Sequence, residues 1–211
     1  MVEAPTGEIL VLAGTNGAGK SSVGGEALRR AGANYLNPDE ITRQLMAANP
    51  ALSEEEANGL GWTEGKRRLE LAIATRSNFA FETTLGGNTI PALLHKACGA
   101  GMPVRMWYCA LANVELHIAR VRARVKKGGH DVPAEKIRQR YDDSREHLVD
   151  LMPKLTELYV YDNSANAPAG AAPAPALVLH LLDRKIVRAA PSEATPEWAK
   201  PIAMTALNLS R

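Results

Sequence analysis

Short apolar runs alternate along the chain with longer segments of helical character. Runs that are mainly apolar, without regular polar alternation, are typical of strands buried on both faces of a parallel sheet. They comprise Ile9–Ala13, Ala33–Asn37, Asn78–Thr84, Pro103–Leu111 and Leu158–Tyr161. Strands that alternate with helices in this way predict an α/β fold, in which a parallel sheet is flanked by helices.

Capping and glycine signals predict the helices between the runs. Ser53 and Glu56 have the spacing of a capping box, so a helical region is expected to begin there and to reach Ser77. Three glycines inside it predict a broken or bent helix. They are Gly59, Gly61 and Gly65. A further helix over residues 88–97 is expected to stop at Gly99.

The pattern changes after Tyr161. Residues 165–176, ANAPAGAAPAPA, predict a flexible surface loop. Leu177–Leu182 and Ile186–Ala189 then predict an edge hairpin, and Thr195–Trp198 predicts the start of a terminal helix. Too little chain follows the loop to form a second domain, so a single domain over residues 1–211 is expected.

The first apolar run leads directly into a phosphate-binding motif. Residues 13–22 read AGTNGAGKSS and contain the P-loop pattern G-x-x-x-x-G-K-S. Glycines let a loop wrap closely around a polyphosphate, and the N–H groups of a following helix, expected over Ser22–Ala31, attract anions. Lys20 is predicted to reach the β- and γ-phosphates, and the Ser21 hydroxyl to ligate Mg²⁺. The predicted nucleotide-binding residues of the loop are Gly14, Thr15, Asn16, Gly17, Ala18, Gly19, Lys20, Ser21 and Ser22.

Two carboxylates are predicted at the same edge of the sheet. Asp39 lies between a strand and the helix that Pro38 begins, and Glu82 ends a second strand. Ligands bind at the carboxyl ends of parallel strands. Asp39 is therefore interpreted as a general base or as a group that orients a substrate hydroxyl, and Glu82 as a contact to substrate or to Mg²⁺-bound water. Equally, Asp39 is an acid that favours a helix start, and Glu82 a solvated strand-end acid.

An arginine-rich helical hairpin is predicted after the run Pro103–Leu111. Asn113 suits the cap of its first helix, and Gly128 and Gly129 suit its turn. Arg120 and Arg124 would share one helix face, whereas Arg122 would point the other way.

A cationic hairpin over residues 113–150 suits a lid that neutralises charge during phosphoryl transfer. The alternatives are a solvated hairpin with an Arg138–Asp142 pair, or a basic nucleic-acid patch. Interleaved acids argue against the nucleic-acid patch. They are Glu135, Asp142, Asp143 and Glu146. His130 on its own would more often be a loop histidine than a catalyst.

Composition narrows the class of protein only slightly. The chain has 211 residues and a formal net charge of +2, so its overall field does not favour nucleic acid or a membrane. Its two cysteines, Cys98 and Cys109, cannot form a disulfide framework and are expected as small buried residues in a reducing compartment. Its first residues have no signal-peptide pattern, and no apolar run approaches a membrane span. These features predict a cytoplasmic protein.

Taken together, the motifs resemble the zeta-toxin-like branch of the P-loop kinases. The matching segments lie in order between residues 13 and 164: AGTNGAGKSS, NPDEI, FETTL, RVRARVKKGGHDVPAEKIRQRY and VYDNS. The resemblance implies a nucleotide-kinase-like fold with ATP and Mg²⁺ as cofactors. It also implies transfer of the γ-phosphate to a sugar hydroxyl of a UDP-N-acetylhexosamine, and a separate antitoxin protein as a partner.

The same resemblance implies roles for individual side chains. Asp39 would be the catalytic base, with Lys20 and two lid arginines, Arg124 and Arg140, acting on the transferred phosphate. Arg120 and Arg138 are the next candidates for phosphate contacts. The substrate-side residues implied are Asn37, Asp39, Glu82, Thr83, Thr84 and His130. Gly86 departs from the pattern, because better-known toxins carry an arginine there beside the sugar nucleotide.

A hypothesis of another class stays open beside the kinase. A nucleotide-binding regulatory module or ATPase would keep the P-loop but would need no acceptor and no base at Asp39. A kinase of a different metabolite is also compatible with the motifs.

Overall fold

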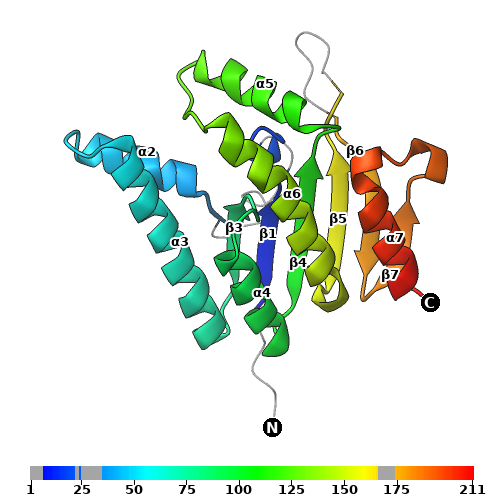
Figure 1. Cartoon of the computed structure of the whole chain (residues 1–211). Helices are drawn as coiled ribbons and strands as arrows, with labels where there is room; N and C mark the ends of the chain where they lie inside the picture. Colours follow the sequence, from blue (N-terminus) through cyan, green and yellow to red (C-terminus); the bar gives the residue numbers. More distant parts are fainter. Residues whose placement is uncertain (1–6, 22–23, 25–34, 166–173) are drawn as a thin grey trace.

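Five parallel strands, built from the apolar runs, form most of one seven-stranded sheet in the computed structural model (Figure 1). The structure describes residues 7–21, 24, 35–165 and 174–211. The order of the strands is β2-β3-β1-β4-β5-β6-β7. Strand β1 lies between β3 and β4: the next two strands of the chain, β2 and β3, lie on one side of β1, and the chain then crosses to β4 on the other side. Such a switch in strand order opens a crevice at the carboxyl ends of the strands.

The parallel strands are β1 (Ile9–Ala13), β2 (Tyr35–Leu36), β3 (Phe79–Thr83), β4 (Val104–Ala110) and β5 (Glu157–Asp162). The antiparallel edge hairpin consists of β6 (Ala176–Leu182) and β7 (Lys185–Ala189). The helices are α2 (Pro38–Ala48), α3 (Glu54–Thr75), α4 (Thr89–Gly99), α5 (Val114–Val125), α6 (Ala134–Leu151) and α7 (Lys200–Leu209). Short 3₁₀ turns cover Met152–Lys154, Ser192–Ala194 and Glu197–Ala199.

The predicted α/β fold with a parallel sheet flanked by helices is confirmed, as is the edge hairpin. The caps predicted at Ser53 and Asn113 are also present. Three predictions lie wholly or largely outside the described residues: the helix over Ser22–Ala31, the first part of the strand over Ala33–Asn37, and most of the loop over residues 165–176.

The core lies between the sheet and helices α3, α4, α6 and α7. Tyr108 of β4 is fully buried there, and its hydroxyl lies 3.0 Å from the Ser144 hydroxyl of α6. Burial raises the pKa of Tyr108 well above its ordinary value. Cys109 points to the P-loop side and is buried as expected, whereas Cys98 is only partly buried. The contact between Tyr108 and Ser144 anchors α6, the second helix of the lid hairpin, to the centre of the sheet.

Two flanks rise above the carboxyl ends of the strands (Figure 1). The α5–α6 hairpin stands on one side, and α2 with the upper part of α3 stands on the other. The P-loop follows β1 between these flanks.

The prediction of a broken or bent helix after Ser53 is wrong, because α3 runs without interruption over Glu54–Thr75. One of its glycines, Gly61, serves close packing. A Cβ atom at Gly61 would lie 2.9 Å from the Thr42 Oγ1 and 3.1 Å from the Pro38 carbonyl oxygen, so Gly61 lets α2 approach α3. The helix predicted over residues 88–97 is α4, which ends at Gly99 as expected, although the positive φ of 72° belongs to Gly101.

In the described part of the chain, none of the helices combines the length and the apolar composition that crossing a bilayer requires.

The two glycines of α3 predict stability changes of opposite sign. Gly59→Ala should raise the free energy of unfolding by up to about 1 kcal/mol, because alanine favours a helix and its Cβ would meet nothing within 4 Å. Gly61→Ala should lower it by about 1 kcal/mol or more, because its Cβ would crowd α2. Urea unfolding of the two variants measures both changes. Equal effects would contradict the packing role of Gly61.

Candidate active site

A cleft of about 960 Å³ opens at the carboxyl ends of β1, β2 and β3. Its walls come from the P-loop, the start of α2, one face of α3, the loop after β3 and the lid hairpin. It gathers most of the residues predicted for the site: Asn16, Gly17, Gly19, Lys20, Ser21, Asn37, Asp39, Glu82, Thr83, Thr84, Arg120, Arg124, His130 and Arg140. One cleft therefore holds the predicted phosphate loop, both acids and the lid arginines.

The remaining predicted residues lie elsewhere. Gly14, Thr15 and Ala18 belong to the loop but do not line the cleft, and Ser22 lies outside the described residues. Gly14 adopts a φ of 136°, and a Cβ atom there would lie 2.0 Å from the Cys109 carbonyl oxygen. Only glycine fits this position, because strand β4 presses against the start of the loop.

Lys20 is buried and held from two sides. Its Nζ donates to the Gly14 carbonyl oxygen at 2.7 Å and lies 3.5 Å from the Glu82 Oε1. Parallel pairing of β1 with β3 opposes Leu12 to Glu82, which brings this carboxylate beside the loop that follows β1. The register of two strands thus determines the ion pair.

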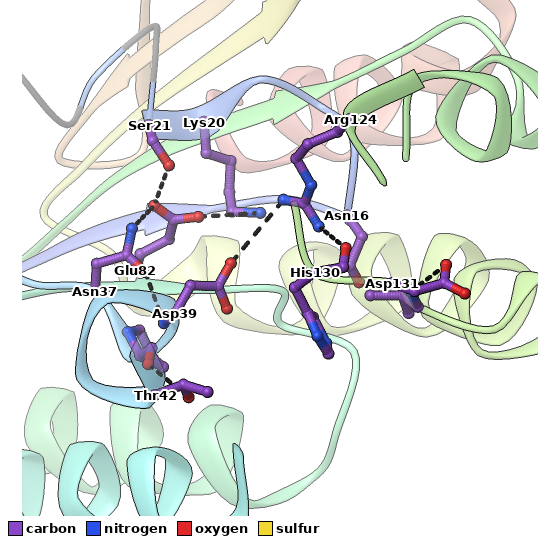
Figure 2. Close-up of polar contacts among 12 residues, drawn as sticks. Asn16, Lys20, Ser21, Asn37, Asp39, Thr42, Glu82, Arg124, His130 and Asp131 are labelled. Carbon is purple, nitrogen blue, oxygen red and sulfur yellow. Dashed lines mark hydrogen bonds and ion pairs between the residues drawn. The ribbon is translucent and has the colours of Figure 1, made fainter. Parts of the chain in front are cut away.

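Glu82 is the centre of a polar network rather than a solvated strand-end acid (Figure 2). Its Oε2 accepts from the Ser21 hydroxyl at 2.8 Å, from the Tyr35 hydroxyl at 2.6 Å and from the Asn37 Nδ2 at 3.3 Å. The alternative reading of Glu82 is therefore wrong. The carboxylate and the hydroxyl of Ser21 bring two hard oxygen donors together at the mouth of the P-loop.

Asp39 lies in the first turn of α2 with its side chain about half exposed, at 52%. Asn37 caps this helix by accepting from the Asp39 backbone N–H at 2.9 Å. The Asp39 Oδ2 lies 4.0 Å from the Arg124 Nη1 of the lid, as Figure 2 shows. An acid that only favoured the helix start would need no partner across the cleft. Here it faces the cleft and the lid.

Arg124 reaches the cleft from α5. Its Nη2 donates to the His130 carbonyl oxygen at 3.0 Å. Its Nε is buried without a hydrogen-bond partner. A buried donor without a partner is costly, so this nitrogen marks a place where an anionic oxygen would fit.

Arg140 reaches the cleft from α6. Its Nη1 donates to the Asn16 Oδ1 at 2.9 Å, and burial lowers the pKa of the guanidinium from its ordinary value. A Cβ atom at Gly86 would lie only 3.0 Å from the Arg140 Cα. An arginine at position 86 would therefore collide with the helix that carries Arg140. This explains the departure at Gly86 in terms of packing.

The other lid arginines take different places. Arg120 lines the cleft and donates to the carbonyl oxygens of Ser164 and Ala165 at 3.2 and 3.3 Å. Arg138 does not line the cleft. It pairs with Glu115 of α5 at 2.5 Å, because it lies on a different face of α6 from Arg140. The suggested Arg138–Asp142 pair is replaced by a pair between Arg145 and Asp142.

Sequence reasoning missed one wall of the cleft. Asn58, Trp62 and Lys66 of α3 all line it, and Trp62 is 48% exposed. Their spacing of four residues would have revealed a shared face if the helix had been expected to be continuous. The lid reaches this wall through His130, whose Nδ1 contacts Glu54 and whose Nε2 lies 3.5 Å from the Asn58 Nδ2.

A buried histidine supports the P-loop from the lid and was also missed. His117 of α5 lies against the loop, and its Nδ1 is 2.8 Å from the Asn16 carbonyl oxygen. Burial lowers the pKa of His117 to about 4, so the ring is neutral near pH 7. The sequence gives no signal for this role, because a single histidine between Leu116 and Ile118 on a helix carries no motif.

The residues of the cleft fit a nucleoside triphosphate with Mg²⁺ better than a metal site built from protein ligands alone. Within the described part of the chain, no group of three or more His, Cys, Asp or Glu side chains is arranged to hold a metal. Ser21 and Glu82 supply two oxygen ligands, and Mg²⁺ commonly takes one or two protein ligands together with substrate phosphates. The unpartnered Arg124 Nε and the buried Lys20 suit the phosphates themselves.

Comparison with solved structures agrees with the fold. AvrRxo1-ORF1 in complex with AvrRxo1-ORF2 and ATP superposes with a TM-score of 0.66 at 13% identity, over 97% of this chain and 64% of that chain. This chain therefore spans less than two thirds of that structure. A chain of the PezAT chromosomal toxin-antitoxin system of Streptococcus pneumoniae gives a TM-score of 0.51 at 15% identity, over 75% and 68% of the two chains.

Comparison of sequences identifies the family. A protein of Haemophilus influenzae, described as uncharacterized, is 33% identical over 134 residues, which are 61% of this chain and 88% of that protein. The model of the AAA domain family AAA_33 matches residues 9–147, from β1 through most of the lid. These residues are more than half of the chain and contain nearly all of the cleft described above. The chain therefore belongs to the AAA domain family AAA_33.

Proposed function

We propose that this protein is a kinase that transfers the γ-phosphate of ATP, with Mg²⁺, to a hydroxyl group of a small molecule. The observation that carries the proposal is the position of Asp39. Its carboxylate faces the same cleft as the P-loop and lies 4.0 Å from Arg124 of the lid. A P-loop alone binds a nucleotide, but an acid opposite it gives an acceptor hydroxyl a place to lose its proton.

The proposed reaction is an in-line displacement. The acceptor oxygen bonds to the γ-phosphorus, the bond from phosphorus to the bridging oxygen of ADP breaks, and the hydroxyl proton passes to Asp39. Lys20, Arg124 and Arg140 offset the charge that spreads over the transferred group. Ser21 and Glu82 would hold Mg²⁺, which neutralises charge on the β- and γ-phosphates when bound.

The acceptor we propose is a sugar nucleotide of the UDP-N-acetylhexosamine type, which the zeta-toxin-like motifs imply. The substrate-side group would consist of Asn37, Glu82, Thr83, Thr84 and His130, all on the cleft wall. Gly86 leaves this group without the arginine of the better-known toxins, and Lys66 on the opposite wall offers a positive charge in its place.

We also propose a separate protein partner of the antitoxin kind. One similar structure is described as AvrRxo1-ORF1 with a second protein, AvrRxo1-ORF2, and another as part of a toxin-antitoxin system. A nucleic acid is not part of the proposal, because acids are interleaved with the lid arginines and Arg138 is paired with Glu115.

A regulatory nucleotide-binding module is the second candidate. It shares the P-loop, Lys20 and Ser21 with the kinase but gives Asp39 no task. It predicts a change of structure on ATP binding with no phosphorylated product for any acceptor.

Asp39→Asn should lower turnover of ATP with an acceptor by about a hundredfold or more, because the amide cannot take the hydroxyl proton. ATP binding should change little. Glu40→Gln, one residue further along the same helix and outside the cleft lining, is the matched control and should keep wild-type turnover. If Asn at position 39 is as active as Asp, Asp39 is not the base.

Arg124→Ala should lower kcat by about a hundredfold, because a charge that stabilises the transition state is lost. Arg122→Ala is the control on the same helix, since Arg122 does not line the cleft. Steady-state assays of both variants give the comparison. Similar losses in both would show that the hairpin acts through overall charge and not through a placed guanidinium.

Mass spectrometry of a metabolite extract incubated with the protein, ATP and Mg²⁺ tests the acceptor directly. The proposal predicts one class of metabolite that gains a single phosphoryl group, and no gain when EDTA removes Mg²⁺. UDP-N-acetylglucosamine added alone should gain the same mass. A gain on another metabolite would keep the kinase and reject the sugar nucleotide, and no gain anywhere would favour the regulatory module.

A further inference from the structure

Two carbonyl groups of the P-loop point away from the cleft and are held by side chains. The Asn16 carbonyl oxygen lies 2.8 Å from the His117 Nδ1 of the lid helix α5. The Ala18 carbonyl oxygen accepts from the Asn163 Nδ2, just after β5, at 2.9 Å. Both side chains are buried, with His117 at 0% and Asn163 at 3% exposure.

The geometry of the peptide bond gives these contacts a consequence on the other side of the loop. In a planar trans peptide, the carbonyl and the following N–H point in opposite directions. If the carbonyls of Asn16 and Ala18 face His117 and Asn163, the N–H groups of Gly17 and Gly19 face the cleft, which both glycines line. Among the described residues, no group accepts either N–H. Two donors are thus left for an anion.

The neutral His117 ring carries its proton on Nδ1, the nitrogen that faces the Asn16 carbonyl oxygen. Its Nε2 accepts from the Leu111 backbone N–H at 3.3 Å, so the neutral ring carries its proton on Nδ1, towards the Asn16 carbonyl oxygen. The low pKa of about 4, which burial causes, keeps the ring neutral near pH 7. The histidine therefore acts as a donor to the loop and an acceptor from the end of β4.

The two glycines of the loop need the contacts from His117 and Asn163, because glycine alone does not fix the orientation of the adjoining peptides. Gly17 and Gly19 adopt φ values of 82° and 83°, which glycine reaches easily, but glycine also makes it easy for the adjoining peptides to rotate. The loop is pressed against the same two supports: a Cβ atom at Gly17 would lie 2.6 Å from the His117 carbonyl oxygen, and one at Gly19 would lie 2.5 Å from the Asn163 Nδ2. A rotated peptide would turn a carbonyl oxygen towards the phosphates.

We propose that His117 and Asn163 are positioning residues, which fix two peptide units of the P-loop so that the N–H groups of Gly17 and Gly19 face the nucleotide phosphates. The inference rests on the nucleotide binding of the proposed function, but it does not depend on phosphoryl transfer. His117 belongs to α5 of the lid, so the lid also helps to determine the conformation of the P-loop.

Two isosteric substitutions at position 117 separate this role from a general structural one. His117→Asn keeps an N–H donor near the place of Nδ1 and loses the acceptor for Leu111. His117→Gln keeps an acceptor near the place of Nε2 and loses the donor to Asn16. Each variant loses one of the two hydrogen bonds, so both should melt at a lower temperature than the wild type.

Calorimetric titration with ATP and Mg²⁺ should separate the two variants. His117→Gln should bind ATP about tenfold more weakly or worse, whereas His117→Asn should stay within about threefold of the wild type. In amide NMR spectra, the signals of Gly17 and Gly19 should move on addition of ATP in the wild type and the Asn variant, and much less in the Gln variant. Asn163→Asp, which turns a donor into an acceptor facing Ala18, should also weaken ATP binding by about tenfold.

Equal ATP affinity in the Gln variant and the wild type, or equal losses in the Gln and Asn variants, would overturn the inference. If the His117→Gln protein does not fold, Asn163→Asp decides it: unchanged ATP affinity in that variant overturns the proposal. A wild type that binds no ATP would overturn this inference and the proposed function together. ATP binding without transfer to any acceptor would overturn the proposed function alone.

Discussion

The contact on which the site depends is the one that Glu82 makes with Lys20 and Ser21. It exists because β3 pairs with β1 in parallel, so that the carboxylate at the end of one strand meets the loop that follows the other. The side chains of Lys20 and Ser21 thus share one acid. Anionic phosphates with Mg²⁺ would compete for these partners, and the hard oxygen of Glu82 would remain available to the metal.

The cleft around this contact has two walls of different character. The lid side is cationic and contacts the P-loop at Asn16. Arg140 donates to the side-chain oxygen of Asn16, and His117 contacts its backbone carbonyl oxygen. The side formed by α2 and α3 carries Asp39, Trp62 and Lys66, which would face the proposed acceptor. The walls meet where Arg124 approaches Asp39 and where His130 contacts Glu54. A group passing between nucleotide and acceptor would cross the cleft at this meeting point.

Much of this could be predicted from local patterns, and what was missed has physical causes. The P-loop, Asp39, Glu82 and the inward face of α5 follow from strand ends and helical spacing, and these residues do converge. Arg138 and Arg140 lie two residues apart on α6 and so on different faces, which helical spacing could have separated; the pairing of Arg138 with Glu115 on another helix could not be predicted in the same way. The continuity of α3 depends on the close approach of α2 at Gly61, and the role of His117 depends on a loop distant in sequence. Tertiary contacts of this kind leave no local pattern.

The most direct measurement of the central claim is a crystal structure with a non-hydrolysable ATP analogue and Mg²⁺. The account predicts that Lys20 exchanges the Gly14 carbonyl oxygen for phosphate oxygens, that Ser21 and Glu82 lie at the metal, and that Asp39 and Arg124 face the terminal phosphate. A nucleotide bound elsewhere, or a terminal phosphate directed away from Asp39, would contradict it.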